Sequence, residues 1–206
     1  MELIDAIRTR RSIRKFKPDP VPRDIIIKIL EAANLAPSAG NKQCWEFLVL
    51  QRSLLDRMQK ILVDSFQGVL DAVSEDDFRE IVKDLPIPCD DSQDKVDGLK
   101  LFFKYLGNAP LAIIVTVPKA EDKWTMHNNI KDGSAATQNL LLAAWNEGLG
   151  TCWMTGPLFM RENEIFRFLN ISKQKEIIGI IPLGVPDQHP STPIKVDVQK
   201  ITFWLG

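Results

Sequence analysis

The sequence predicts a mixed fold in which helices pack on a small number of buried strands. Three observations lead to this prediction. Short β-branched or aromatic apolar runs are bounded by turn residues, amphipathic helical repeats lie between them, and one long helical stretch ends in glycine. A chain of 206 residues suits one domain or one subunit of an oligomer, so we expect residues 1–206 to form a single domain.

The first part of the chain predicts two helices and a strand. A short first helix carries apolar residues on one face: Leu3, Ile4 and Ile7. A second helix, over about 22–36, has Pro22 in its first turn and stops at Pro37. Residues 45–50 (WEFLVL) form a bounded apolar run that predicts a buried strand. Ser53 is expected to cap the helix that follows.

The pattern weakens between Asp64 and Asp97, where acidic residues cluster. We expect a lid-like excursion over about 64–100, with a solvated surface loop as the alternative. Several apolar side chains would then form a wall of the lid: Phe66, Phe78, Leu85 and Phe102–Phe103. Residues 99–106 are predicted to be helical, and 111–117 (LAIIVTV) a second buried strand.

The longest predicted helix runs from about His127 to Glu147 and ends at Gly148. Its apolar positions surround much of its circumference after Ala135, which indicates a central helix. A strand at 151–155, a helix at 161–169 and a strand at 177–183 follow, with Pro182 expected at an edge or bulge. The proline-rich tail ends in an apolar, strand-like segment at 201–205. Because exposed strands invite pairing, we expect it to dock on a partner subunit in preference to its own.

Composition restricts the class of partner. A net charge of −1 argues against nucleic acid and against a membrane surface. No apolar run approaches the ~20 residues that span a bilayer, and the first residues lack the cationic region of a signal peptide. Three cysteines without a CxxC pair favour free thiols in the cytoplasm. The two histidines have no metal-ligand spacing, so no metal site is expected.

Two polar segments stand out as candidate sites. The run Arg10-Arg11-Ser12-Ile13-Arg14 supplies several cations and a hydroxyl, which together suit a phosphate monoester; a solvated basic surface is the alternative. The turn Pro37-Ser38-Ala39-Gly40-Asn41-Lys42-Gln43 offers backbone N–H groups and two side-chain amides, which suit the edge of a heterocycle; a plain surface turn is the alternative. Gly148-Leu149-Gly150 follows a helix and lacks a third glycine, so a dinucleotide fingerprint is not predicted.

Several segments in a fixed order resemble the nitroreductase family of FMN-dependent oxidoreductases. RRSIRKF, PVP, ILEAA and APSAGNKQCW come in the family's order, followed by GLGTCWM and by a strand that ends in LGVP. The resemblance covers both ends and the centre, and leaves 64–100 unmatched. It implies an α+β fold, a three-layer α/β/α sandwich around a mostly antiparallel central sheet. It also implies an intertwined homodimer that exchanges the C-terminal strand.

The resemblance further implies which residues hold the cofactor. Arg10 and Ser12 match positions at the phosphate and ribityl chain, and Arg14 matches a cation near the ribityl and pyrimidine side. The other matched positions form the turn that reaches the flavin from the other subunit, the backbone beside the ring, and a basic residue that closes on the phosphate: Pro37, Ser38, Asn41, Gln43, Gly150, Thr151, Cys152 and Lys195. Arg11 of the basic run and Ala39 of the turn lie among these positions, and we expect them to bind the cofactor as well. Cys44 stands where the family has proline, which leaves the contact of Gln43 open.

From the resemblance we expect tightly bound FMN at the dimer interface and a ping-pong exchange. NAD(P)H would pass hydride to flavin N5, and a nitroaromatic, quinone or similar electron-poor small molecule would then take the electrons. Because the flavin carries this chemistry, no catalytic side chain is predicted. Reductive dehalogenation or an oxygen-dependent flavin reaction is the nearer alternative, and a non-enzymatic polyanion-binding protein the distant one. The sequence does not choose between NADH and NADPH, nor does it name the acceptor.

Overall fold

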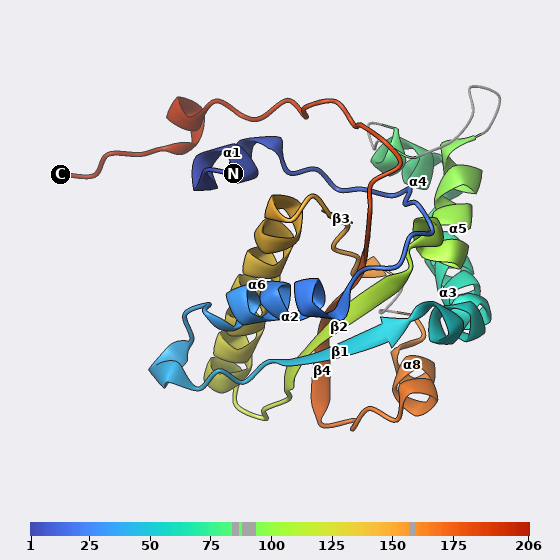
Figure 1. Ribbon diagram of the computed structural model, residues 1–206, viewed down its shortest axis with the longest axis horizontal. Coiled ribbons are helices and arrows are strands. Elements are labelled where there is room, and N and C mark those ends of the chain that lie inside the picture. Colours follow the sequence, from blue (N-terminus) through green and yellow to red (C-terminus); the bar gives the residue numbers. More distant parts are fainter. Residues whose placement is uncertain (84–86, 88–93, 157–159) are drawn as a thin grey trace.

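The computed structural model describes residues 1–83, 87, 94–156 and 160–206, and Figure 1 shows one sheet between two layers of helices. In this part of the chain the sheet has the strand order β1-β2-β4-β3, and neighbouring strands are antiparallel. The strands are β1 (Glu46–Gln51), β2 (Leu111–Pro118), β3 (Gly150–Thr151) and β4 (Lys175–Gly184). The predicted α/β/α sandwich with a mostly antiparallel sheet is confirmed.

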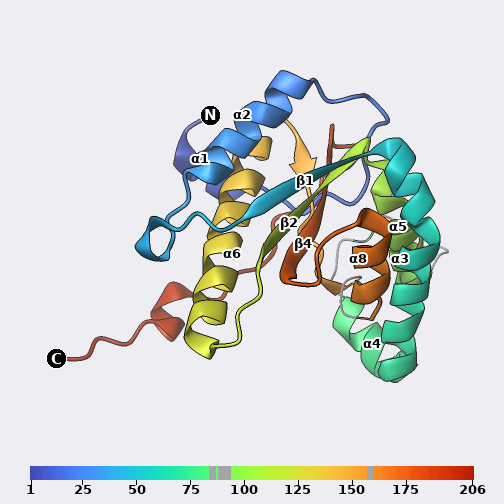
Figure 2. The same cartoon turned by 90° about the horizontal axis from the view of Figure 1, so that it is seen from below.

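Two long helices cover one face of the sheet, and a third lies beside them (Figure 2). They are α2 (Arg23–Asn34), α6 (Lys123–Asn146) and the shorter α1 (Leu3–Thr9). Ile113, Val115 and Val117 of β2 join the core beneath α2 and α6, whereas Ala112 and Ile114 join the core of the opposite face. This alternation follows from the two-residue period of a strand. Gly148, with φ of 76°, lies just beyond the C-terminus of α6, as predicted.

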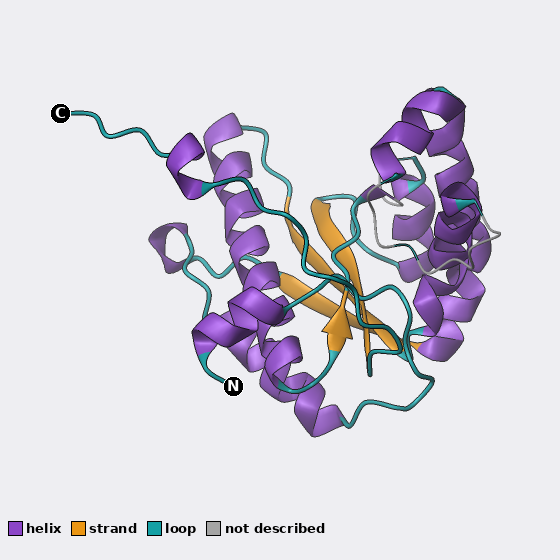
Figure 3. Ribbon diagram, turned by 90° about the horizontal axis from the view of Figure 1, so that it is seen from above, coloured by secondary structure: helices purple, strands orange, loops and turns teal. Residues whose placement is uncertain are grey.

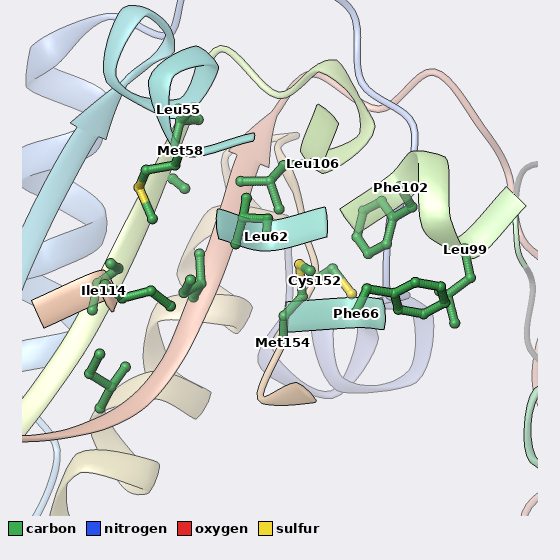
Figure 4. Packing of buried hydrophobic residues seen from close by; sticks show 14 of the residues in the cluster. Leu55, Met58, Leu62, Phe66, Leu99, Phe102, Leu106, Ile114, Cys152 and Met154 are labelled. Carbon is green, nitrogen blue, oxygen red and sulfur yellow. The ribbon is translucent and has the colours of Figure 1, made fainter. Parts of the chain in front are cut away.

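The second helix layer covers the other face of the sheet (Figure 3). Its helices are α3 (Arg52–Ala72), α4 (Glu75–Val82), α5 (Lys95–Tyr105) and α8 (Glu162–Leu169). Figure 4 shows Phe66 and Phe102 packed with Leu62 and Leu99 in the core of this layer. Within the described residues, none of the helices combines the length and apolar content needed to cross a bilayer.

The aromatic side chains expected to line a lid are mostly core residues. Phe66, Phe78 and Phe102 are buried, and the ring centroids of Phe66 and Phe78 lie 5.7 Å apart. The expectation of an open apolar wall is therefore wrong for these three, because α3 continues to Ala72 and packs against α5. Phe103 remains half-buried, and Leu85 lies outside the described residues. That this region acts as a lid stays a prediction.

Three local predictions need correction. Gln51, and not Ser53, is the N-cap of α3, and it makes no side-chain capping bond. The third strand spans two residues, because Met154 pairs separately with Ile180 as an isolated bridge. Pro182 lies in an interior strand, yet its missing N–H causes no loss. The backbone N–H and carbonyl of Ile180 both bond to Met154. The nitrogen of Pro182, two residues further on, points to this same side of β4. It lies in the gap between the Met154 bridge and the pairing of β3 with Leu183 and Gly184, where no hydrogen bond is lost.

The C-terminal arm, residues 186–206, leaves the body of the molecule (Figures 1 and 2). It contains one short 3-10 helix, η3 (Val198–Ile201), and no strand forms at 201–205. Trp204 is 93% exposed and Phe203 81% exposed. The apolar face of α1 is uncovered too, with Leu3 68% exposed. Strand exchange with a partner stays a prediction, and these apolar surfaces are consistent with it.

Helix α6 approaches the sheet closely at Gly133. A Cβ atom built at Gly133 would lie 2.7 Å from Val117 Cγ1 and 2.8 Å from Ile178 Cγ1. In an exposed helix, glycine to alanine is stabilising by roughly 0.8–1 kcal/mol. At this position the added methyl must displace two core side chains, which reverses the sign of the effect.

We therefore expect Gly133→Ala to destabilise the protein by about 1–3 kcal/mol in urea unfolding. Ser134→Ala changes the neighbouring half-buried residue of the same helix and should shift stability by less than about 0.5 kcal/mol. A Gly133→Ala variant as stable as the wild type would contradict this packing of α6 on the sheet.

Candidate functional site

Residues 10–14 and 150–152, far apart in sequence, form one continuous backbone surface. The N–H of Ile13 donates to the carbonyl of Thr151 at 2.9 Å, and Ser12 forms a parallel bridge with Thr151. The Ile13 side chain is fully buried beneath Gly150, where a Cβ atom would lie 2.7 Å from Ile13 Cγ1. Glycine at this position thus allows the N-terminal segment to extend the sheet beyond β3.

Arg10, Ser12 and Arg14 gather around Cys152, and we call these four residues the basic cluster. Both guanidinium charges act on the thiol of Cys152, and Ser12 hydrogen-bonds to it. Cys152 is 4% exposed, and Figure 4 shows its side chain beside Phe66 and Met154 in the core. Burial raises the pKa of Cys152, and the two arginines with Ser12 oppose that rise in part. The thiol is protonated near neutral pH and is not a nucleophile.

The basic cluster presents positive charge that the described residues do not neutralise. Burial, then the charge of Arg11, lowers the pKa of the Arg10 guanidinium. Arg14 Nη1 is buried and has no hydrogen-bond partner among the described residues. A buried donor without an acceptor is costly, and so is a desolvated cation. Both features are relieved by an anion or a polar ligand at this place.

Arg11, also predicted to bind the cofactor, faces a different set of partners. Its guanidinium donates to the carbonyls of Arg8 and Arg10 at 2.8 Å each and to Thr192 Oγ1 at 2.5 Å. The structure thus places Arg11 against the C-terminal arm. Lys195 follows three residues after Thr192 and is exposed, so this chain does not bring it to the basic cluster.

Gln188 is a neighbour of the basic cluster that sequence reasoning missed. Its Oε1 accepts from the backbone N–H of Arg14 at 3.1 Å, and Asp187 beside it pairs with Lys15 at 3.3 Å. A single glutamine in a proline-rich arm carries no sequence signal for this contact. The start of the arm is therefore fixed along the N-terminal segment.

The helix layer of α5 also reaches the basic cluster through its last turn. The 3-10 helix η2 (Leu106–Asn108) follows α5, and the carbonyl of Gly107 accepts from the N–H of Phe16 at 2.9 Å. Gly107 has a φ of 63°, and a Cβ atom there would lie 2.2 Å from the carbonyl oxygen of Arg14. Both the backbone angle and the space at this contact require glycine.

The second predicted segment, residues 37–43, is a tightly held turn, which we call the polar turn. It includes η1 (Ala39–Asn41). Ser38 Oγ accepts from the backbone N–H of Gln43 at 2.9 Å, and Gln43 Nε2 donates to Asn41 Oδ1 at 2.8 Å. Gly40, Asn41 and Gln43 have φ values of 61°, 55° and 46°. Two non-glycine residues in the left-handed region mark a strained backbone, the kind often found at functional sites.

Within one chain, the polar turn and the basic cluster lie far apart. The polar turn is anchored on α6 at Asp132, which accepts from the N–H of Ala39. Near the C-terminal end of α6, Trp145 Nε1 donates to Thr9 beside the basic cluster. Thirteen residues separate these anchors, which corresponds to about 20 Å along a helix.

A family model described as "Nitroreductase family" matches residues 7–185 of the chain. A protein of Methanothermobacter thermautotrophicus, provisionally named NADH dehydrogenase/NAD(P)H nitroreductase, is 32% identical over 98% of this chain and 86% of its own length. The 4-nitrobenzoate reductase of Pseudomonas putida is 27% identical over 89% and 85% of the two chains. The iodotyrosine deiodinase of Thermotoga neapolitana is 25% identical over 90% and 89%.

Solved structures share the fold over the whole chain. A BluB-like flavoprotein from Clostridium difficile 630 superposes with a TM-score of 0.76 at 28% identity and covers 100% of both chains. Iodotyrosine deiodinase bound to FMN and 3-iodo-L-tyrosine gives a TM-score of 0.75 over 95% of this chain and 96% of that one. Because its identity to this chain is 24%, the deiodinase structure shows a shared fold and nothing further.

The buried thiol of Cys152 predicts a pH dependence of stability. Because burial raises its pKa in the folded state, the unfolded chain loses this proton first, from about pH 8.5. The contribution of the protonated thiol to the free energy of unfolding is complete below that pH. It is lost as the pH rises toward the folded pKa, and the free energy of unfolding then falls by at most about 1.4 kcal/mol per pH unit. Urea unfolding between pH 7 and 10.5 under reducing conditions measures it. Cys152→Ala should show a shallower alkaline slope, and an unchanged slope would contradict the assignment.

Proposed function

Because the chain belongs to the nitroreductase family, we propose that it is an FMN-dependent oxidoreductase that reduces nitroaromatic, quinone or similar electron-poor acceptors with NAD(P)H. FMN, when bound, supplies the electron-transfer chemistry that links the two substrates. The observation that carries the proposal is the basic cluster, with its buried and unpartnered Arg14 Nη1 beside Thr151 and Cys152. The residues of the chain bind and orient the cofactor.

The phosphate of the cofactor would lie against Arg10 and Ser12. A phosphate monoester carries about −1.5 to −2 charges at neutral pH, and one exposed cation offsets little of that charge. Arg10 is partly buried, and its lowered pKa reflects desolvation and the nearby Arg11. A phosphate here would restore the balance and accept charge-assisted hydrogen bonds. Lys195 would add a further cation when the arm is docked, as a point charge without the bidentate geometry of arginine.

Arg14 would lie at the pyrimidine side of the ring system. Its buried Nη1 supplies a donor that finds an acceptor in a carbonyl-rich heterocycle. A fixed positive charge at this position favours negative charge on the reduced ring, which raises the reduction potential. Gly150, Thr151 and Cys152 would contribute backbone beside the ring, since Ile13 holds this strand in place.

We further propose that each site is built from two copies of the chain. The polar turn, with Pro37, Ser38, Ala39, Asn41 and Gln43, is too far along α6 to meet the basic cluster of its own chain. A second copy can bring its polar turn to the cluster. The uncovered apolar side chains of α1 and the C-terminal arm support such a homodimer.

The acceptor would be chosen by the helices of the second layer. Phe103 of α5 is half-buried and lies near Gly156, where a Cβ atom would be 3.5 Å from the ring. Relatives on this scaffold include an iodotyrosine deiodinase, which keeps reductive dehalogenation as the second candidate. A 5,6-dimethylbenzimidazole synthase of Rhodospirillum rubrum is a further relative, which keeps an oxygen-dependent reaction in the comparison.

The test starts from the colour of the purified protein. We expect a yellow dimer from which denaturation releases FMN. NADH and NADPH are each combined with a panel of nitroaromatic, quinone and halogenated acceptors, with and without oxygen. Faster turnover of nitroaromatics or quinones than of the other classes supports the proposal. A colourless protein that does not regain FMN from solution, or turnover of halogenated substrates alone, contradicts it.

Arg14→Ala should weaken FMN binding by about 1.5–3 kcal/mol, the range for a hydrogen bond to a charged group, which is roughly a ten- to hundredfold rise in Kd. The midpoint potential should fall, because the cation that favours the reduced ring is gone. Arg8→Ala removes an exposed cation of α1 and should leave both values close to those of the wild type. Wild-type affinity and potential in Arg14→Ala would show that the role assigned to Arg14 is wrong.

A further inference from the structure

Helix α6 carries two buried polar side chains one turn apart, Asn129 and Asp132, which we call the polar pair. They are 4% and 7% exposed. Both carboxylate oxygens of Asp132 accept from the backbone N–H of Ala39, at 3.2 and 3.1 Å. Asn129 Oδ1 accepts from the Cys44 thiol at 3.6 Å, and its Nδ2 donates to the carbonyl of Pro118 at 2.9 Å. The polar pair therefore holds the polar turn at Ala39, within it, and at Cys44, directly after it.

A buried aspartate within a helix is unfavourable for the stability of the fold. Aspartate is a poor helix former, and burying its charge costs free energy unless hydrogen bonds repay it. A small apolar residue would serve helix packing better at this position. The carboxylate is instead directed at a backbone N–H of another segment, which indicates that what it stabilises is the shape of the polar turn.

The polar turn needs such support. Asn41 and Gln43 adopt positive φ, a conformation that persists where the surroundings over-determine it. Ser38 Oγ fixes the N–H of Gln43 from within the turn, and Asp132 fixes Ala39 from α6. The exposed Asn41 and Gln43 side chains, joined at 2.8 Å, are thereby displayed as one pair of amides.

The polar pair also explains how the turn tolerates Cys44. Proline at this position would fix its own φ and restrict the residue before it. The Cys44 thiol contacts Asn129, so side-chain bonding to α6 takes over part of that restraint. Burial, then the charge of Asp132, raises the pKa of Cys44, which keeps the thiol protonated and able to donate.

We propose that Asp132 and Asn129 are positioning residues that preorganise the polar turn for the cofactor bound by a partner subunit. The inference rests on the proposed function, because that function places Asn41 and Gln43 against the flavin ring. Neither member of the polar pair touches the cofactor in this account. Their effect is conveyed through the backbone of the turn, so that its amides meet the ring without a further ordering cost.

The test compares Asp132→Ala with Asp132→Asn in the full-length protein. We expect Asp132→Ala to raise the Kd for FMN by tenfold or more and to shift the midpoint potential of the bound flavin. In the apoprotein, amide hydrogen exchange at residues 38–43 should quicken. Asp132→Asn keeps an oxygen that can accept from Ala39, so it should recover most of the affinity and protection.

Asp122→Ala is the matched control. Asp122 also accepts a backbone N–H, that of Thr125 at 2.8 Å, but this bond caps α6 itself. The control should lower the melting temperature and leave the Kd for FMN within about threefold of wild type. If Asp132→Ala lowers the melting temperature while Kd, potential and exchange at the turn match the wild type, the residue is structural and the inference is overturned.

Two further outcomes can be told apart: a variant that does not fold, and a wild-type protein that binds no FMN. If Asp132→Ala does not fold, Cys44→Ala takes its place, because it removes the thiol that Asn129 accepts from and little else. Faster exchange at the turn with a severalfold rise in Kd supports the inference, and wild-type values of both overturn it. If the wild-type protein itself binds no FMN, the proposed function fails, and the assignment of the polar pair to a cofactor site fails with it.

Discussion

The arrangement depends on the contact between Ile13 and the strand that begins at Gly150. A hydrogen bond from Ile13 to Thr151 and a fully buried isoleucine beneath a glycine bind the start of the chain to its centre. In an extended segment alternate side chains face opposite ways, so fixing Ile13 inward turns its neighbours toward Cys152. The cations are thus held in place by backbone pairing and by an apolar anchor.

Helix α6 sets the distance between the two candidate binding segments, the basic cluster and the polar turn. It packs on the sheet along most of its length, and it touches the N-terminal segment near its C-terminal end and the polar turn near its middle. The length of α6 between Asp132 and Trp145 keeps these two contacts about 20 Å apart within one chain. The proposed homodimer would bring the polar turn of a second copy to the basic cluster, and the apolar surfaces left bare on one chain are consistent with it.

Much of this could be predicted from the sequence, because strand and helix periodicity are local. Strands β1, β2 and β4 and helices α2 and α6 were indicated by apolar spacing alone. Charge density pointed to Arg10 and Arg14, and the order of motifs to the family. Burial is not local, so the sequence places Phe66 on a lid whereas the structure buries it in the core, and no sequence signal indicates that Asp132 is buried. The strand predicted at 201–205 does not form, because within the described residues this segment has no neighbouring strand to pair with.

Gly107 joins the two halves of the molecule mechanically. Its carbonyl accepts a hydrogen bond from the N–H of Phe16, and its φ is positive. A Cβ atom at this position would collide with the carbonyl of Arg14. The turn that closes α5 is therefore joined directly to the backbone that carries Arg14. With Arg14 at the flavin and the α5 layer beside the acceptor, as proposed, a mutation at Gly107 would change acceptor preference and reduction potential together.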